Sequence, residues 1–256
     1  MKYKYVYGPV SSWRLGSSLG VDPVYTGRGK ICSFNCIYCQ VGKTRTLTLK
    51  RRVFVPASEI IEEIKNLPAL KIDYITLSGA GEPTLARNLG DIIKKIRKIR
   101  GEKIAVLTNS SLTYKKDVRR DLSLADFVIA KLDAHEGALF TAINKPAKGS
   151  KLDKVVKGLK EFRSLYKGRL ALQIMFVGKN KAYAKEIASL ARKIRPNEVQ
   201  INTPLRPCGV SPLPKKELDR VKKFFQGMNC TSVYDAKKKK VKPISRKSML
   251  KRRGKI

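Results

Sequence analysis

The sequence predicts an α/β fold in which a parallel sheet, closed or partly closed as a barrel, carries helices on its outer side. Short apolar runs rich in β-branched residues, each bounded by polar residues, Gly or Pro, indicate buried strands. Between these runs, apolar residues recur at helical spacing. Because strand and helix alternate along the chain, the strands are expected to run parallel, with any chemistry at their carboxyl ends.

The expected strands cover residues 73–79, 103–109, 126–133, 170–177 and 198–204, with a short edge strand at 231–234. The helical stripes lie at residues 60–67, 89–96, 155–162, 187–194 and 218–225. No stretch rich in Gly, Ser or Pro divides the chain, so we expect one core domain over residues 1–236. Residues 237–256 hold eleven Lys or Arg and no acid, which indicates a basic C-terminal tail, either an arm or a short helix added to the core.

Length and composition limit the class of protein. With 256 residues, 42% of them hydrophobic, the chain can bury one sizeable core. No apolar run approaches the ~20 residues of a membrane span, and the N-terminus lacks the apolar stretch of a signal peptide. Cysteine is scarce and odd in number, which argues against a secreted disulfide scaffold. We therefore expect a soluble, cytoplasmic protein without a membrane partner, whose reduced thiols serve a metal or catalysis.

Charge is the second strong feature, because 56 Lys and Arg against 20 Asp and Glu give a formal net charge of +36. Thermophilic chains add Lys and Glu together, so heat adaptation would not leave so many cations without partners. A polyanion would bind them and release counterions, which makes nucleic acid the first candidate partner. A generally basic, solvated surface is the alternative.

Three of the five cysteines, Cys32, Cys36 and Cys39, stand together in the stretch KICSFNCIYCQ. A structural zinc site needs four ligands, and the remaining cysteines and the single histidine do not supply a paired second set. A disulfide would use two of the thiols and leave one. A cubane iron–sulfur cluster has four irons, so three thiolates leave one iron without a protein ligand, where chemistry can occur.

The segment CSFNCIYC, with the spacing C-x3-C-x2-C and Tyr38 before its last cysteine, resembles the cluster loop of the radical S-adenosylmethionine (SAM) superfamily. It lies near the N-terminus of the strand-and-helix pattern, and LSGAGEP (77–83) follows at a fitting distance. In that family a Gly-Gly-Glu-Pro-like segment after the second strand binds the amino group of SAM. Here that segment corresponds to Gly79, Ala80, Gly81 and Glu82.

The resemblance implies a partial (β/α)6 barrel in which Cys32, Cys36 and Cys39 hold a [4Fe–4S] cluster and SAM binds its open iron. An electron from a partner such as a ferredoxin or flavodoxin would cleave SAM to methionine and a 5′-deoxyadenosyl radical, which abstracts hydrogen from the substrate. The reaction class stays open between oxidoreductase, lyase and transferase. Tyr38 would lie near the adenine of SAM or pack beneath the loop, and Glu82 would accept a hydrogen bond or brace its own segment.

Other polar residues end the later strands, where the fold would direct them toward the same pocket. The resemblance implies SAM contacts for Thr108, Asn109, Ser110, Asp133, Gln173 and Asn202. For each of them a capping or loop role is the alternative. Lys131, in KLDA, departs from the small residue that many relatives carry and leaves the contact of Asp133 open.

The stretch YGPVSSWRLGSSLGVDP (7–23) resembles more narrowly a subgroup of small radical SAM proteins related to the wyosine-forming tRNA enzymes. Arg14 and Arg206 would suit a substrate phosphate or carboxylate, which a guanidinium binds bidentately, or would brace the loops over the barrel mouth. The resemblance implies that the wyosine-forming enzymes hold a second cluster on three further cysteines upstream of the SAM loop, and residues 1–31 of this chain contain none. The substrate class can therefore carry over while the reaction does not.

Cys208 and His135 are the candidate catalytic side chains, with packing roles as the alternative. The candidates for a cationic rim around the barrel mouth are Lys50, Arg51, Arg52, Arg252 and Arg253. We expect a radical SAM enzyme that modifies RNA, with tRNA as the first candidate. The alternatives are the same chemistry on a protein, peptide or small metabolite, and a non-catalytic RNA-binding protein that carries a cluster or zinc.

Overall fold

The computed structural model describes residues 3–237 and 239–253; residues 1–2, 238 and 254–256, which include four positions of the predicted tail, lie outside the described part. Its strands are β1 (Val6–Ser12), β2 (Gly16–Val21), β3 (Ile31–Cys32), β4 (Thr46–Leu47), β5 (Tyr74–Leu77), β6 (Lys103–Thr108), β7 (Phe127–Lys131), β8 (Arg169–Met175), β9 (Glu198–Asn202) and β10 (Cys230–Ser232). Eight of them form one sheet in the order β1-β2-β5-β6-β7-β8-β9-β10, and β3 pairs with β4. All neighbours in the sheet run parallel except β1, which is antiparallel to β2.

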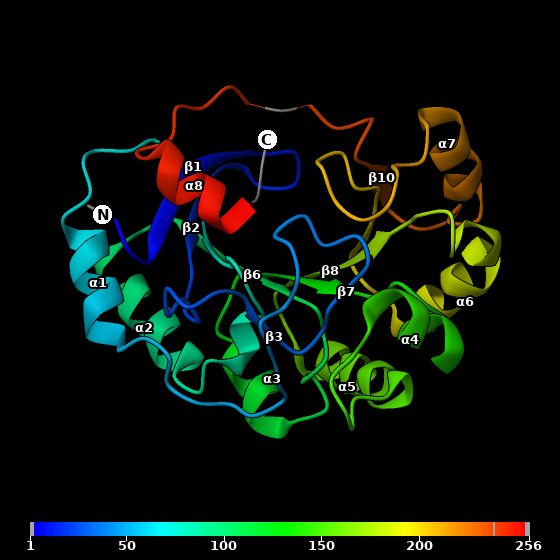
Figure 1. The fold of residues 1–256 in the computed structure, drawn as a ribbon, viewed down its shortest axis with the longest axis horizontal. Helices are drawn as coiled ribbons and strands as arrows, with labels where there is room; N and C mark the ends of the chain where they lie inside the picture. Colours follow the sequence, from blue (N-terminus) through cyan, green and yellow to red (C-terminus); the bar gives the residue numbers. More distant parts are fainter. Residues whose placement is uncertain (1–2, 238, 254–256) are drawn as a thin grey trace.

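The helices are α1 (Ala57–Lys65), α2 (Leu89–Ile99), α3 (Lys116–Leu122), α4 (Gly137–Asn144), α5 (Leu152–Leu165), α6 (Ala184–Ile194), α7 (Lys215–Lys223) and α8 (Arg246–Arg253), with 3-10 turns η1 (Pro83–Leu85) and η2 (Lys181–Tyr183). Figure 1 shows helices surrounding the strands, which lie at the centre. α2 illustrates the reason, because it buries Ile92, Ile93 and Ile96 while Lys94 and Lys95 are exposed.

The inner side of the sheet is partly polar and is not filled by apolar packing alone. The hydroxyl groups of Ser18 on β2 and Thr76 on β5 lie 2.6 Å apart in the interior. Both residues line a cavity of about 630 Å³, here called the central cavity. The helices and the outer side of the strands therefore supply the apolar core, while the interior of the curved sheet leaves room for a ligand.

The C-terminal segment returns from one edge of the sheet to the other. β10 and β1 are the two edge strands, and Figure 1 shows the chain passing from β10 back to α8, which packs over β1. The Ile244 N–H donates to the Gly8 carbonyl (2.6 Å), and the Ser248 hydroxyl donates to the Val6 carbonyl (3.0 Å). The basic tail thus includes a helix docked on the N-terminal hairpin.

The predicted α/β fold with a parallel, partly closed sheet is confirmed. The sequence patterns did not reveal β1, β2, α3 and α4 because these elements lack a strong apolar period: β2 reads GSSLGV, and α3 reads KDVRRDL. In the described part of the chain, no helix is both long and apolar enough to cross a membrane.

Candidate functional site

The three clustered cysteines leave the end of β3 together. Cys32 is the last residue of β3, Cys36 and Cys39 follow in the next loop, and all three thiols are free. Each sulfur accepts a hydrogen bond from a side-chain nitrogen. The pairs are Asn109 Nδ2 with Cys32 (3.5 Å), Asn144 Nδ2 with Cys36 (3.5 Å) and Lys30 Nζ with Cys39 (2.8 Å). Such donors stabilise negative charge on sulfur, so the loop is arranged for thiolates.

Burial favours the neutral form of two of these thiols. It raises the pKa of Cys32 to about 12, against the opposing effect of Lys30, and it also raises the pKa of Cys36, to which the Asp133 carboxylate adds. A metal centre reverses such shifts, because a coordinating thiol is deprotonated outright. Over residues 3–237 and 239–253, no three Cys, His, Asp or Glu side chains surround a position for a single ion. A [4Fe–4S] cluster takes each thiolate at a different iron, so three single thiolates on one loop fit its ligand set.

The segment 79–83, which follows β5, packs directly against the cysteine segment. The Glu82 N–H donates to the Ile31 carbonyl (3.2 Å), and a Cβ on Gly81 would lie 1.8 Å from that same oxygen. Gly79 has φ +136°, and a Cβ there would lie 2.3 Å from the carboxylate carbon of Asp22. Close approach therefore requires glycine at both positions, and the two predicted motifs form one site.

The Glu82 carboxylate is bonded on both oxygens within the protein. Oε1 accepts from the Thr84 N–H (3.1 Å) and from the hydroxyl groups of Thr84 (2.6 Å) and Thr108 (2.7 Å). Oε2 accepts from the Asn109 N–H (2.6 Å), and Asn109 is the residue that reaches Cys32 with its side chain. Glu82 therefore braces the ends of β5 and β6 around Cys32.

Asp133 is the corresponding buried carboxylate on the β7 side of the loop. Its Oδ2 accepts from the Tyr38 hydroxyl and from Asn144 Nδ2 (2.9 Å), and its Oδ1 accepts from the Met175 N–H (2.8 Å). Lys131 Nζ lies 3.5 Å from Oδ1 and 4.9 Å from the centre of the Tyr38 ring. Tyr38 thus packs beneath the loop with its hydroxyl on a buried acid, and Asp133 positions the loop.

The remaining predicted strand-end contacts differ in what they reach. Ser110 is buried, and its hydroxyl donates to the Lys131 carbonyl (2.9 Å). Gln173 is buried within β8. The Ala80 N–H donates to the carboxylate of Asp22 (3.0 Å). Asn202 ends β9 and lines the central cavity, so it lies where a bound ligand could reach it.

Two cavities adjoin the cysteine loop. The smaller has a volume of about 400 Å³ and is lined by Cys36, Cys39 and Cys208, among others. The larger is the central cavity, and Gln40 and Val41 line both of them. The two residues that follow Cys39 therefore border both cavities, and the structure brings Cys208 to the same cavity as two of the clustered thiols.

His135 has a different environment. Its ring packs against the Tyr183 ring with 5.0 Å between centroids, and its Nε2 lies 3.9 Å from a carboxylate oxygen of Glu136. It lines neither the central cavity nor the cavity beside Cys36. The structure therefore does not bring this candidate acid or base to the cysteine loop.

The basic candidates that follow the cysteine loop divide into one buried and two exposed residues. The Arg51 side chain is 6% exposed and forms ion pairs with Asp117 and with Asp121, the latter at 2.6 Å. Lys50 and Arg52 are exposed. The expectation that Arg51 belongs to a free cationic rim is wrong, because two carboxylates of α3 already neutralise its guanidinium.

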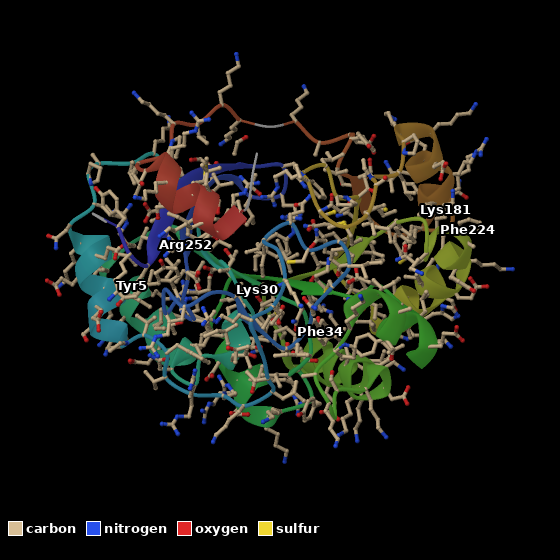
Figure 2. The ribbon with its side chains drawn as sticks, in the orientation of Figure 1. Tyr5, Lys30, Phe34, Lys181, Phe224 and Arg252 are labelled. Carbon is tan, nitrogen blue, oxygen red and sulfur yellow. The ribbon has the colours of Figure 1, made fainter. Side chains whose placement is uncertain are left out.

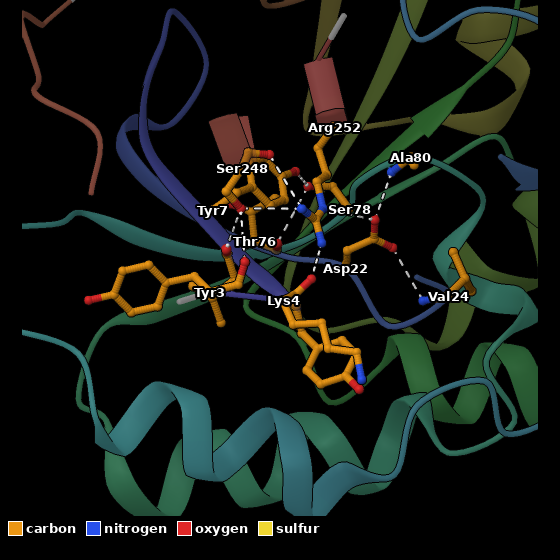
Figure 3. A network of polar contacts seen from close by, with 12 residues as sticks. Tyr3, Lys4, Tyr7, Asp22, Val24, Thr76, Ser78, Ala80, Ser248 and Arg252 are labelled. Atoms are coloured by element: carbon orange, nitrogen blue, oxygen red, sulfur yellow. Dashed lines mark hydrogen bonds and ion pairs between the residues drawn. The ribbon is translucent and has the colours of Figure 1, made fainter. Parts of the chain in front are cut away.

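Arg252 is also withdrawn from solvent. It is 2% exposed, its guanidinium carbon lies 3.8 Å from the centre of the Tyr25 ring, and its Nε lies 3.5 Å from Asp22. Figure 3 shows Asp22 between Arg252 and the Ala80 N–H. Arg252 therefore links the tail to the segment 79–83, and its placement on an exposed rim is wrong. Arg253 lines the central cavity.

Three residues of this site were not singled out from the sequence. Lys30 lies two residues before Cys32, and a cation so near a thiol cluster was a usable signal. Asn144 ends α4, 108 residues after Cys36, and no local pattern marks it. Asp22 acquires its cationic partner, Arg252, only when α8 docks, so this ion pair depends on tertiary structure.

Comparison with known proteins places these motifs in a family. The model of the radical SAM superfamily matches residues 28–204. A UPF0026 protein of Synechocystis is 42% identical over 203 residues, which cover 79% of this chain and 76% of that protein. A UPF0026 protein of Methanocaldococcus jannaschii is 39% identical over 208 residues, covering 78% of this chain and 64% of that protein.

A solved structure shares the fold. A radical SAM methyltransferase from Sphaerobacter thermophilus superposes with a TM-score of 0.62 over 84% of this chain and 65% of that chain. The two sequences are 17% identical. At this identity the likeness concerns the arrangement of strands and helices.

Proposed function

The chain belongs to the radical SAM superfamily, and we propose that Cys32, Cys36 and Cys39 hold its [4Fe–4S] cluster. Members of this superfamily are enzymes that use such a cluster with SAM and require an electron donor. The observation that carries the proposal is the nitrogen donor at each of the three sulfurs. When bound, the cluster delivers the electron that cleaves SAM to methionine and a 5′-deoxyadenosyl radical.

We propose the segment 79–82 as the site for the amino group of SAM. An ammonium group needs acceptors, and Gly79 and Gly81 allow backbone carbonyls to approach it without a Cβ in the way. Glu82 and Asn109 act as positioning residues, because they fix the ends of β5 and β6 relative to Cys32. The central cavity, lined by Gly79 and Asn202, adjoins this segment and leaves room for the rest of a ligand.

The protein's own contribution to the reaction is to position the reactants and exclude water. α8 and the hairpin of β1 and β2 line the central cavity from one side, and the loop after β9 lines it from another. Cys208 lines the smaller cavity with Cys36 and Cys39, and we propose it as a candidate hydrogen donor. A ferredoxin or flavodoxin in the cytoplasm is the proposed source of electrons.

We propose RNA, and tRNA first, as the substrate. The support is the net charge of +36, together with nitrogen-tipped side chains that project around the outline of the molecule in Figure 2, where Lys30 and Arg252 lie inside that outline. Neutralised phosphates release counterions, so such a surface gives a salt-sensitive affinity for RNA. The target base must be presented from a loop or flipped out to reach the interior of the sheet.

The test is anaerobic and uses the cluster-loaded protein with SAM and a strong reductant. We expect 5′-deoxyadenosine to form, and to form faster when bulk tRNA from the source organism is added at low salt. Stimulation should decline as salt rises, since RNA binding weakens. A rate of SAM cleavage that tRNA does not change, with RNA binding that does not increase at low salt, would remove RNA as the substrate and favour a protein, peptide or metabolite.

A further inference from the structure

The central cavity contains arginines from three distant parts of the chain. Arg14 lies in the turn between β1 and β2, Arg206 follows β9, and Arg253 ends α8. All three line the cavity, together with Arg252, and its lining includes no Asp or Glu. Arg252 has Asp22 as its counter-ion. Three cationic side chains thus converge on one cavity.

These three guanidinium groups lack carboxylate partners. In the described part of the chain, no carboxylate oxygen lies within ion-pair distance of Arg14, Arg206 or Arg253. Arg206 donates to the Gln40 side chain (2.6 Å) and to the Arg253 carbonyl, both of them neutral acceptors. Among residues 3–237 and 239–253, the buried Nε and Nη1 of Arg14 find no hydrogen-bond partner, and the guanidinium faces the Trp13 ring at 5.1 Å.

The mutual approach of these cations is unfavourable without an anion. Burial, followed by repulsion from Arg253 and Arg206, lowers the pKa of Arg14 to about 10. Burial and repulsion from Arg253 likewise lower the pKa of Arg206 to about 10. Arg206 has such acceptors in Gln40 and the Arg253 carbonyl, whereas a role in bracing loops would provide the buried nitrogen atoms of Arg14 with acceptors that they lack among the described residues. The unpartnered nitrogen atoms of Arg14 instead leave donors available to a ligand.

We propose that Arg14, Arg206 and Arg253 form a subsite for the phosphate group of the substrate. A phosphate monoester carries a charge of about −1.5 to −2 and three acceptor oxygens, which match several guanidinium groups better than a single carboxylate does. The volume of about 630 Å³ lies in the range of small-molecule sites. The subsite therefore fits a phosphorylated metabolite or one nucleotide unit, whether free or presented by an RNA. Only the reaction that follows binding rests on the proposed function.

Direct binding tests the subsite independently of SAM cleavage. Cluster-loaded, full-length protein is titrated calorimetrically with inorganic phosphate, with uridine 5′-monophosphate and with uridine, all at one ionic strength. We expect the two phosphates to bind and uridine to bind at least about tenfold more weakly. Arg14→Gln should weaken phosphate binding about tenfold or more, which corresponds to one lost charge-assisted contact. The matched control, Arg220→Gln, removes one exposed arginine of α7 and should bind phosphate like the wild type.

A second readout separates ligand binding from bracing. In phosphate-free buffer Arg14→Gln should unfold at the same temperature as the wild type or higher, because it removes a buried cation without a counter-ion. A bracing role predicts a lower unfolding temperature. Arg14→Lys, which retains the charge but not the bidentate geometry, should bind phosphate with intermediate affinity.

Two results would overturn the subsite: phosphate that binds the wild type and Arg14→Gln equally, and an Arg14→Gln variant that is destabilised while its phosphate affinity is unchanged.

The source of the phosphate follows from a competition experiment. If tRNA binding is displaced by inorganic phosphate and weakened by Arg14→Gln beyond the effect of Arg220→Gln, the phosphate belongs to RNA; if only the mononucleotide behaves so, it belongs to a small molecule. Phosphate binding that persists while no 5′-deoxyadenosine forms would contradict the proposed function alone.

Discussion

Lys30 places its ammonium group 2.8 Å from the Cys39 sulfur and 3.2 Å from the Gly42 carbonyl, and it is 8% exposed. A cationic donor in so buried a place interacts strongly with charge on the thiolates. Hydrogen bonds to sulfur and net charge are among the factors that set the reduction potential of an iron–sulfur cluster. Lys30 is therefore expected to make the reduced cluster easier to form.

Lys30→Met should lower the midpoint potential of the cluster. Loss of about 1–2 kcal/mol of stabilisation of the added electron corresponds to roughly 40–90 mV for a one-electron couple. The measurement is a redox titration followed by electron paramagnetic resonance. Lys65→Met, which removes an exposed lysine from α1, is the control and should titrate like the wild type. A Lys30→Met potential equal to that of the wild type would show that the donor has no electrostatic role.

Arg51 and Arg52 are neighbours with opposite roles. Arg51→Gln leaves the buried Asp121 carboxylate with only the exposed Arg120, at 3.8 Å, as an ion-pair partner, so we expect a loss of about 3 kcal/mol in the free energy of unfolding. Arg52→Gln should leave stability unchanged and weaken RNA binding, with a shallower dependence on salt, because Arg52 is exposed. Chemical denaturation and RNA titration of both variants check this pair. Equal stability of the two variants would contradict the structural role of Arg51.

At the scale of elements, the site depends on how closely three strand ends approach one another. The segment after β5 contacts β3 through the Glu82 N–H and the Ile31 carbonyl, and β6 joins them through Asn109. α8 adds a fourth contact, because Arg252 reaches Asp22 behind the same segment. The predicted SAM segment and the cysteine loop are therefore held together by direct contacts, and a change in either should displace the other.

Gly81→Ala tests this coupling. The added Cβ would lie 1.8 Å from the Ile31 carbonyl oxygen, so the two segments must separate. We expect destabilisation of about 3 kcal/mol, at the upper end for overpacking, together with loss of most of the bound iron and sulfide after reconstitution. Gly101→Ala, where a Cβ meets nothing within 4 Å, is the control. Wild-type iron content in Gly81→Ala would contradict the coupling.

At the scale of the whole molecule, the sequence predicted what depends on local patterns. The parallel strands from β5 to β9 are apolar runs with polar ends, and the cysteine spacing is contiguous, so both are visible along the chain. Asn144 and Cys36 meet only because α4 returns to the loop, and Arg252 meets Asp22 only because α8 crosses from one sheet edge to the other. These long-range contacts carry no signal in a single sequence. They also decide which basic residues are exposed, which composition cannot reveal.

The central claim is that the three thiols on the loop after β3 hold the cluster that cleaves SAM. The most direct measurement compares iron content and 5′-deoxyadenosine formation, under anaerobic conditions, in the wild type, Cys36→Ala and Cys230→Ala, the last replacing a cysteine of β10. We predict a loaded, active wild type and Cys230→Ala, and a Cys36→Ala variant without SAM cleavage and with most of its iron lost. Wild-type iron content and activity in Cys36→Ala, or no product from a fully loaded wild type, would contradict the account.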